Sequence, residues 1–398
     1  MSSITEKELP GSGGPPSGAL GTPVCIIGSR GVPACYGGFE TFAEHFARYL
    51  AESRVRVCVV GENQGELAES DAAALDGIEI VHTTKQKGLN PILFYIESAW
   101  KMPSGFPVVL CLGPGGIFAW PICFFRGTKL VLNLDGLNSR RQKWSWLKQK
   151  MFRLLETLAA LLPIEKVLDS QALVPEFWVP NSSKARVHVV EYGSVDIAAK
   201  GSLAQDEAVL NEWGLAVEDF LLVVARLEPE NSIEMIAAAH RRSGTPTPLV
   251  VVGNWGSKDF ERRVRAEAAE NCVFLGAIHN QTRLHALRRT AAVYLHGHQV
   301  GGTNPSLVEA MASDRPILAH DNPFNRATLE GGVARFFSDI DDLAESLRRL
   351  DDGKVSSSEQ NDRTCYEVYR DRYTWEKICT RYVQVLARAS SSTKDGDN

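Results

Sequence analysis

Residues 295–311 read Leu-His-Gly-His-Gln-Val-Gly-Gly-Thr-Asn-Pro-Ser-Leu-Val-Glu-Ala-Met, and they join a short apolar segment to a helical one. Asn304 is a favourable N-cap residue, and Pro305 suits the first position of a helix. The pattern therefore predicts a strand, a flexible glycine cradle at residues 301–303 and a helix that begins after Asn304. A strand–loop–helix unit of this kind is typical of a doubly wound α/β fold.

The same alternation of apolar runs and helical segments continues through the whole chain. Continuous runs rich in β-branched residues are typical of parallel strands that helices cover on both faces. The sequence therefore predicts two doubly wound, Rossmann-like α/β domains in series, facing each other across a central cleft. The expected strands are residues 24–28, 55–60, 78–82, 108–112, 129–134, 166–169 and 187–190, and then residues 221–225, 249–253, 272–275, 291–296, 316–319 and 334–337.

Shifts in composition divide the chain further. Residues 1–23 are rich in Gly, Ser and Pro and are expected to form a disordered leader. The first domain is expected at residues 24–200 and the second at residues 215–364, because Ala, Gly, Ser and acidic residues replace the strand pattern between them. Residues 365–388 have the spacing of a helix that packs back across the boundary, and residues 389–398 form a polar tail.

The composition also excludes several classes of protein. The 398 residues include 43 Lys and Arg against 48 Asp and Glu, and this net charge of -5 gives no general cationic field for nucleic acid. The eight cysteines include no C-x-x-C pair, which favours reduced core thiols in a cytoplasmic protein. Residues 106–125 carry no charge and are long enough for a membrane span. The central Gly113-Pro114-Gly115-Gly116 instead favours a strand, a glycine turn and a short apolar helix.

A glycine-rich loop follows the first expected strand. It runs from Gly28 through Gly37 and Gly38 into a helix with Glu40 in its first turn. Backbone N–H groups at such a helix start suit phosphate oxygens or sugar hydroxyls. The spacing matches neither G-x-G-x-x-G nor G-x-x-x-x-G-K-[ST], so it is typical neither of a dinucleotide dehydrogenase nor of a P-loop NTPase. A tight turn needed only for packing is the alternative.

Two further features predict a diphosphate site in the second domain. Arg226 follows an expected strand and offers the fixed positive charge that a departing diphosphate requires. Glu309 lies one turn into the helix that Asn304 begins, where its carboxylate can accept two hydrogen bonds from a ribose. The alternatives are a surface ion pair at Arg226 and a solvated Glu309.

Together these motifs resemble the family 4 retaining glycosyltransferases of GT-B fold. The finer pattern is similar to bacterial rhamnosyltransferases of surface-polysaccharide assembly. It consists of residues 31–34 (Gly-Val-Pro-Ala), 36–42 (Tyr-Gly-Gly-Phe-Glu-Thr-Phe), 133–137 (Asn-Leu-Asp-Gly-Leu), 229–231 (Pro-Glu-Asn), 296–298 (His-Gly-His) and 301–307 (Gly-Gly-Thr-Asn-Pro-Ser-Leu). The resemblance covers residues 24–386.

The resemblance implies a transferase that moves rhamnose from dTDP-rhamnose to a hydroxyl of a lipid-linked saccharide, with retention at the anomeric carbon. The second domain would bind the nucleotide sugar and the first would receive the acceptor. No cofactor, metal ion or protein nucleophile is implied. The implied catalytic residues are Arg226, Glu40, Asp135 and His298. The implied donor-binding residues are Gly37, Gly38, Asn231, Gly301, Gly302, Thr303, Asn304, Ser306, Leu307 and Glu309.

Two other hypotheses stay open. Asn138, Asp314 and Ala327 differ from the residues usual in these relatives, which motivates a sugar-nucleotide-binding assembly protein without turnover. The other hypothesis is a transferase with a UDP-hexose donor. His296 and His298 could bind a metal ion, but no acidic cluster accompanies them, so hydrogen bonding to sugar or phosphate is favoured.

Residues 140–150 combine two tryptophans with five cations. Such a stretch suits an anionic membrane surface, near which a lipid-linked acceptor would lie. The chain is therefore expected in the cytoplasm, peripheral at the inner face of the cell membrane. A solvated helix face is the alternative.

Overall fold

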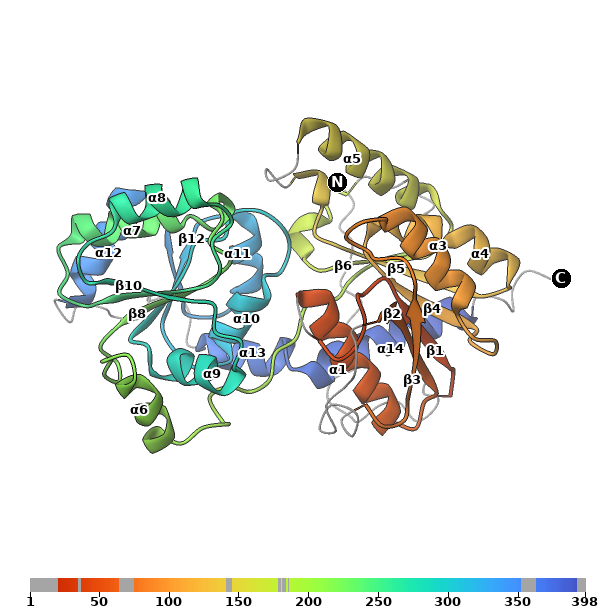
Figure 1. Ribbon diagram of the computed structural model, residues 1–398, viewed down its shortest axis with the longest axis horizontal. Helices are drawn as coiled ribbons and strands as arrows, with labels where there is room; N and C mark the ends of the chain where they lie inside the picture. The colour runs from red at the N-terminus through yellow and green to blue at the C-terminus, as the bar shows by residue number, and fades with distance from the viewer. Residues whose placement is uncertain are drawn as a thin grey trace.

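A computed structural model of the chain describes residues 21–34, 37–63, 75–140, 145–177, 180, 184, 186–351 and 363–391. Two lobes, each built around a parallel sheet, lie side by side (Figure 1). The predicted fold class, two doubly wound α/β domains, is confirmed. Each predicted strand is present, with ends that differ from the prediction by at most two residues.

The N-terminal sheet has seven parallel strands in the order β3-β2-β1-β4-β5-β6-β7. The central strands β1 and β4 are completely buried, which explains their uninterrupted apolar sequences. Because the order of strands reverses beside β1, the carboxyl ends of β1 and β4 mark the point where such sheets bind ligands. The strands are β1 (Val24–Ile27), β2 (Val57–Glu62), β3 (Ile78–Thr83), β4 (Val108–Leu112), β5 (Lys129–Asp135), β6 (Glu165–Leu168) and β7 (Val187–Val189).

Helices cover both faces of this sheet. One face packs against α1, and the other packs against α3, α4 and α5. The charge-free residues 106–125 form β4, a 3-10 turn and α4, as predicted. The helical elements are α1 (Gly38–Glu52), α3 (Pro91–Lys101), η1 (Pro114–Phe118), α4 (Trp120–Phe125), η2 (Asn138–Arg140), α5 (Trp146–Leu161) and η3 (Gln171–Leu173).

The C-terminal sheet has six parallel strands in the order β10-β9-β8-β11-β12-β13. They are β8 (Leu221–Val224), β9 (Leu249–Val252), β10 (Cys272–Gly276), β11 (Val293–His296), β12 (Ile317–His320) and β13 (Arg335–Phe337). The helical elements of this half are α6 (Leu203–Asn211), η5 (Pro229–Asn231), α7 (Ile233–Ser243), α8 (Lys258–Glu267), α9 (Gln281–Thr290), α10 (Pro305–Met311), α11 (Pro323–Thr328), α12 (Ile340–Asp351) and α13 (Cys365–Arg372).

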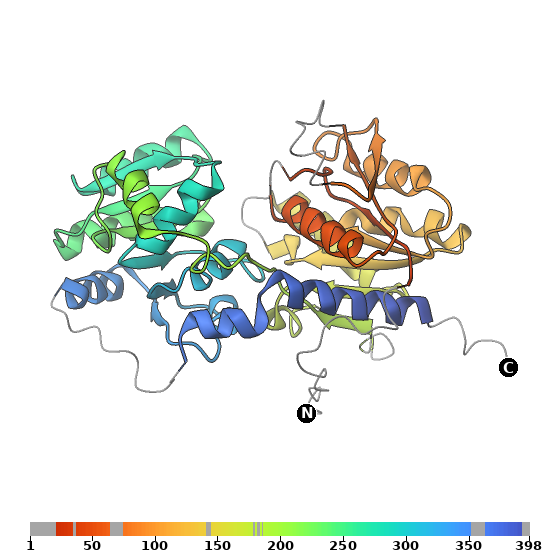
Figure 2. The same ribbon diagram turned by 90° about the horizontal axis from the view of Figure 1, so that it is seen from below.

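The chain returns to the N-terminal domain at its end. The single helix expected at residues 365–388 is two helices, α13 and α14 (Trp375–Ser391). They separate because Thr374 pairs with Ser194 of the interdomain connection, where Ser194 N–H donates to the carbonyl oxygen of Tyr373 (2.9 Å). In Figure 2, α14 runs beneath the N-terminal domain, and its side chains join the core on the α1 side of the sheet.

Several expectations concern residues that the structure does not describe. Residues 1–20 and 392–398, which contain most of the expected leader and tail, lie outside the described residues, as does Cys35. The other seven cysteines are free thiols. Among the described helices, none has the length and apolar character needed to cross a membrane.

Candidate active site

Two loops of the C-terminal domain are bonded into one unit. Asn231, which follows β8, donates from Nδ2 to the carbonyl oxygen of Arg226 (2.7 Å). Its Oδ1 accepts a hydrogen bond from Nδ1 of His298, in the loop after β11 (2.7 Å). Because an amide oxygen can only accept, Nδ1 of His298 carries a proton. Asn231 therefore connects Arg226 and His298, two of the residues that the family resemblance implied to be catalytic.

The same two loops approach each other so closely that only glycine fits at position 297. A Cβ atom there would lie 2.3 Å from the carbonyl oxygen of Asn231. Ser232 donates to the carbonyl oxygen of Gly297 (2.7 Å), and Gln299 Nε2 donates to Ser232 Oγ (2.8 Å). Ser232 and Gln299 were not expected at the site, and their position next to the selected motifs is the only sequence signal for them.

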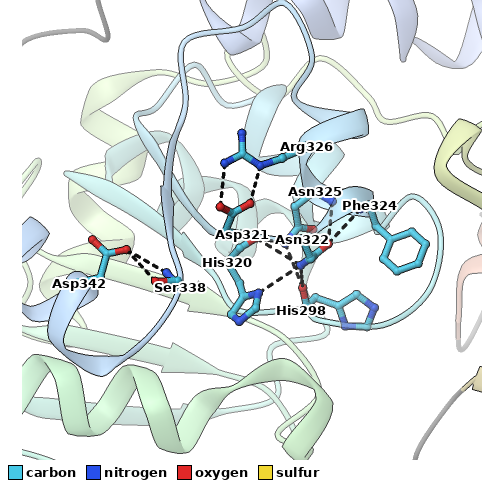
Figure 3. Close-up of polar contacts among 9 residues, drawn as sticks. All are labelled: His298, His320, Asp321, Asn322, Phe324, Asn325, Arg326, Ser338 and Asp342. Carbon is cyan, nitrogen blue, oxygen red and sulfur yellow. Dashed lines mark hydrogen bonds and ion pairs between the residues drawn. The ribbon is translucent and has the colours of Figure 1, made fainter.

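The loop after β12 supports His298 (Figure 3). Asn322 and Asn325 each donate a side-chain amide hydrogen to the carbonyl oxygen of His298, both at 3.0 Å. Asn322 also caps α11 by accepting hydrogen bonds from the backbone of Phe324 and Asn325. The ring of Phe324 packs against the core of the N-terminal domain. Helix α11 thus connects the His298 loop to the other domain.

The predicted start of α10 is confirmed. Asn304 is the N-cap, and its side chain accepts a hydrogen bond from the backbone N–H of Ser306 (2.9 Å). Ser306 Oγ in turn donates to the carbonyl oxygen of Val224 at the end of β8 (2.8 Å), and it also bonds with the hydroxyl of Tyr294 (2.7 Å). Ser306 therefore fixes the N-terminus of α10 two residues away from Arg226.

Glu309 makes an ion pair that the sequence did not indicate. Arg288 on α9 is almost fully buried, with 1% of its side chain exposed, and its Nη2 donates to Glu309 Oε2 (2.5 Å). The same nitrogen donates to Ser306 Oγ (3.0 Å). The guanidinium engages Oε2, while the expectation that Glu309 accepts two hydrogen bonds from a ribose stays a prediction. The side chain of Glu309 is 31% exposed.

The glycine cradle contacts the N-terminal domain directly. Thr303 Oγ1 donates to the carbonyl oxygen of Asp169, which follows β6. A Cβ atom on Gly302 would lie 1.7 Å from Asp169 Oδ1, and one on Gly136 would lie 3.1 Å from the backbone nitrogen of Gly302. Asp169 and Thr303 are both buried. We call these contacts between residues 301–303, Gly136 and Asp169 the interdomain junction.

We expect Gly302→Ala to lower the free energy of unfolding by about 1–3 kcal/mol, because the added methyl group overpacks the junction. Gly88→Ala is the control, since a Cβ there has no atom within 4 Å. Denaturant unfolding of Gly302→Ala, Asp169→Ala and the double variant would measure the effect. The double variant should lose less stability than the sum of the two single variants. Strictly additive losses would contradict the contact.

Two helix starts meet beside the junction. A Cβ atom on Gly38, the first residue of α1, would lie 3.7 Å from Cγ of Pro305, the first residue of α10. The backbone N–H groups at a helix start carry positive partial charge. The N-termini of α1 and α10 therefore bring positive potential to the same place from the two domains, as an anionic group would require.

Asp135 lies at the carboxyl end of β5 in a left-handed conformation, with φ of 59°. Asn133 stabilises this turn: its Oδ1 accepts from the backbone N–H of Asp135 (2.7 Å), and its Nδ2 donates to the hydroxyl of Tyr382 on α14 (2.8 Å). Burial, together with the charge of Asp135, raises the pKa of the Tyr192 hydroxyl well above its usual value. Tyr192 is therefore protonated at neutral pH and can donate to Asp135.

The side chain of Glu40 holds the glycine-rich loop between β1 and α1. Its side chain is buried, and Oε1 accepts a hydrogen bond from the backbone N–H of Arg30 (2.9 Å). Lys87 was not expected here, yet its ammonium donates to the carbonyl oxygen of Gly28 and lies 4.8 Å from the centre of the Phe39 ring. Burial lowers the pKa of Lys87. Glu44 also accepts a hydrogen bond from the backbone N–H of Ala34 (2.6 Å), so two carboxylates and one ammonium hold the loop after β1.

The histidine pair is not part of a larger cluster of metal-binding side chains among the described residues. Burial, followed by electrostatic interactions with His298 and Arg288, lowers the pKa of His296 well below its usual value, so its ring is neutral at pH 7. Within the ranges that the structure describes, no group of three or more His, Cys, Asp or Glu side chains could hold a metal ion.

The loops and helices described above coincide with a known family. Residues 211–364 match the family model of the glycosyl transferases group 1, and this range contains Arg226, Asn231, the cradle and Glu309. This half of the chain is therefore similar to a group 1 glycosyltransferase domain. Residues 22–94 match a second model, a domain of unknown function (DUF1972), which contains the glycine loop and α1. No curated protein matches the chain.

Solved structures share the two-domain architecture of this chain. Sucrose-phosphate synthase from Thermosynechococcus elongatus has a TM-score of 0.74 and 17% identity, and the match covers 94% of this chain and 100% of that one. Anabaena HepE, solved with UDP and glucose, has a TM-score of 0.72 and 15% identity, with 92% of this chain and 100% of that chain covered. AviGT4, a glycosyltransferase of avilamycin A biosynthesis, has a TM-score of 0.63 and 17% identity, with 94% and 99% covered. The chain therefore has a GT-B fold.

Proposed function

We propose that the chain transfers a sugar from a nucleotide-diphosphate donor to a hydroxyl group of an acceptor. One observation carries the proposal. Within the C-terminal domain, Asn231 joins Arg226 to His298, and Ser306 joins the start of α10 to the end of β8. The backbone of Arg226, a helix N-terminus and a carboxylate are thus fixed relative to one another, and together with the Arg226 guanidinium they suit a diphosphate and its ribose.

The donor would lie in the C-terminal domain. Glu309 Oε1 would accept a ribose hydroxyl, while Arg288 keeps the carboxylate in place. Arg226, together with the backbone around Gly302, Thr303, Ser306 and Leu307, would stabilise the diphosphate as negative charge develops on it. Asn231 would assist by holding the carbonyl group of Arg226 and the ring of His298 in fixed positions.

The transfer step needs no protein nucleophile. The bond between the anomeric carbon and the diphosphate oxygen breaks, and its electron pair leaves with the diphosphate. The acceptor oxygen forms a bond to the same face of that carbon, and its proton passes to an oxygen of the departing phosphate. The configuration is therefore retained. Gly37, Gly38 and Glu40 would lie beside the transferred sugar, and Asp135 would lie beside the acceptor.

The finer assignment is rhamnose from dTDP-rhamnose, transferred to a lipid-linked saccharide of a cell-surface polysaccharide at the inner face of the membrane. The motifs at residues 36–42, 133–137 and 301–307 support it. A UDP-hexose donor is the second candidate, because Anabaena HepE was also solved with UDP-glucose. The third candidate is a binding protein without turnover.

Donor consumption separates these candidates. The protein would be incubated with dTDP-rhamnose or UDP-glucose, with and without membranes that supply lipid-linked saccharide, and release of the nucleoside diphosphate would be measured. We expect rapid release from dTDP-rhamnose only when the acceptor is present. Release from UDP-glucose but not from dTDP-rhamnose would favour the UDP-hexose donor. Binding of a donor without release under any condition would favour the assembly protein.

We expect a chelator to leave the rate of transfer unchanged, because Arg226 and the helix N-termini supply the positive charge that a divalent ion would otherwise provide. The measurement compares initial rates with and without EDTA after dialysis. If EDTA abolished transfer and a divalent ion restored it, a metal ion would have to be included, with His296 and His298 as its first candidate ligands.

A further inference from the structure

The N-terminal domain exposes large apolar side chains along one edge. Helices α3, α4 and α5 all contact η1 and lie together on the outer side of this domain (Figure 1). They and the turn before α3 carry thirteen of the fourteen large apolar side chains that the described residues expose. We call these thirteen the α3–α5 face; they are Leu89, Ile92, Leu93, Ile96, Trp100, Phe124, Phe125, Trp146, Leu147, Met151, Leu154, Leu158 and Leu161.

The exposed apolar residues of α5 form a continuous stripe along the helix. Its exposed apolar residues from Leu147 to Leu161 are spaced four, three, four and three positions apart, which places them in one stripe along the helix. The opposite side of the helix is the buried one and contains Glu156, Ala159 and Ala160. Six of the eight large apolar side chains of α5, all except Phe152 and Leu155, are therefore exposed.

The charges around this stripe have one sign. Each charged side chain that α5 exposes is positive: Lys148, Lys150 and Arg153. The only acid on α5, Glu156, is buried and accepts hydrogen bonds from the backbone and hydroxyl of Ser139 (3.1 and 2.6 Å). The only acid on α3, Glu97, accepts hydrogen bonds from the backbone N–H groups of Thr84 and Lys85, both at 2.8 Å.

We infer that the α3–α5 face docks onto a lipid bilayer that contains anionic headgroups. Trp100 and Trp146 are 74% and 67% exposed, and tryptophan favours the boundary between headgroups and hydrocarbon. The α5 stripe would enter that boundary while its flanking cations contact the headgroups. A second copy of the chain suits the face less well, because a symmetric contact would bring the cations of the two copies together.

This inference rests on the proposed function for its purpose, since a lipid-linked acceptor requires approach to a membrane. The α3–α5 face also differs from the membrane surface that the sequence predicted, which was the stretch at residues 140–150. Arg140 forms an ion pair with Glu176 (3.3 Å), and residues 141–144 lie outside the described residues. The apolar residues of α3 and α4, which the stretch at residues 140–150 does not include, form much of the docking surface.

Vesicle co-sedimentation tests the inference with the full-length protein. Vesicles of phosphatidylcholine with one third phosphatidylglycerol would be compared with vesicles of phosphatidylcholine alone. The variant Trp100→Glu/Leu154→Glu places acids on the face, and Leu203→Glu is the matched control, because Leu203 is 59% exposed on α6 of the other domain. We expect about a tenfold loss of binding in the face variant, no loss in the control and weaker binding of the wild type to neutral vesicles.

Three outcomes would overturn the inference: no binding of the wild type to anionic vesicles, equal binding of the face variant, or an equal loss in the Leu203→Glu control. Sedimentation velocity tests whether a second copy of the chain covers the face instead. A dimer in the wild type that is absent in the face variant would assign the α3–α5 face to that second copy. Nucleotide-sugar binding, measured in the same variants without vesicles, reports on the proposed function separately. It should be unchanged whether or not the face binds lipid.

Discussion

Replacing Arg226 by alanine should lower kcat about 10²- to 10³-fold and change the KM for the donor far less. The physical reason is that negative charge on the diphosphate grows as the sugar leaves, so a guanidinium stabilises the transition state more than the bound donor. Arg226 is about half exposed, and its two nearest carboxylates, Glu228 and Glu230, lie at 3.9 and 3.8 Å. These contacts are loose, so the side chain can turn toward a ligand. Steady-state kinetics with varied donor concentration would measure the effect.

Two controls make the Arg226 result specific. Arg226→Lys keeps the charge but loses the planar, two-pronged geometry, so its kcat should lie between those of the wild type and the alanine variant. Arg262→Ala removes an exposed arginine of the same domain, on α8, and should leave kcat unchanged. A large rise in KM with an unchanged kcat would show instead that Arg226 only binds the ground state.

Replacing Glu309 by glutamine should weaken binding of the nucleoside diphosphate about ten- to a hundredfold, which is the effect expected for loss of a charged hydrogen-bond acceptor. Glutamine is preferable to alanine, because its amide oxygen can still accept from the buried Arg288. An alanine would leave that guanidinium without its carboxylate and would combine a folding defect with the binding defect. Isothermal titration with the nucleoside diphosphate alone reports on this step.

The pair of Glu309 and Arg288 allows a stricter test. Arg288→Gln removes the charge that holds Oε2 but leaves Glu309 itself in place. It should also weaken binding, and combining it with Glu309→Gln should weaken binding less than the product of the two single effects. Unchanged binding in Glu309→Gln would remove this residue from the donor site.

The strands and the start of α10 could be predicted because their signals are local. An apolar run specifies a buried parallel strand, and Asn304-Pro305 specifies a helix start, without knowledge of the rest of the chain. The link between Arg226 and His298 could only be inferred from the resemblance, since Asn231 joins loops 67 residues apart. The motifs predicted that both loops contribute to the donor site, but they predicted no contact between the two loops.

The unexpected residues lacked a local signal. Arg288 is one of several arginines on α9, and only its position four residues after Leu284, on the buried side of the helix, distinguishes it. Asp169 was included in an expected strand, whereas β6 ends at Leu168 and Asp169 reaches the cradle of the other domain. The gap between α13 and α14 depends on the pairing of Thr374 with Ser194, which no helical periodicity reveals.

Binding of a panel of nucleotide sugars shows whether the C-terminal domain binds a nucleotide-sugar donor through Glu309. Wild type, Glu309→Gln and Arg262→Ala would each be titrated calorimetrically with dTDP-rhamnose, UDP-glucose and GDP-mannose. We expect wild type and Arg262→Ala to bind dTDP-rhamnose most tightly and Glu309→Gln to bind it at least tenfold more weakly. If the wild type bound none of the three, or if Glu309→Gln bound dTDP-rhamnose as tightly as the wild type does, the proposed donor site would be wrong.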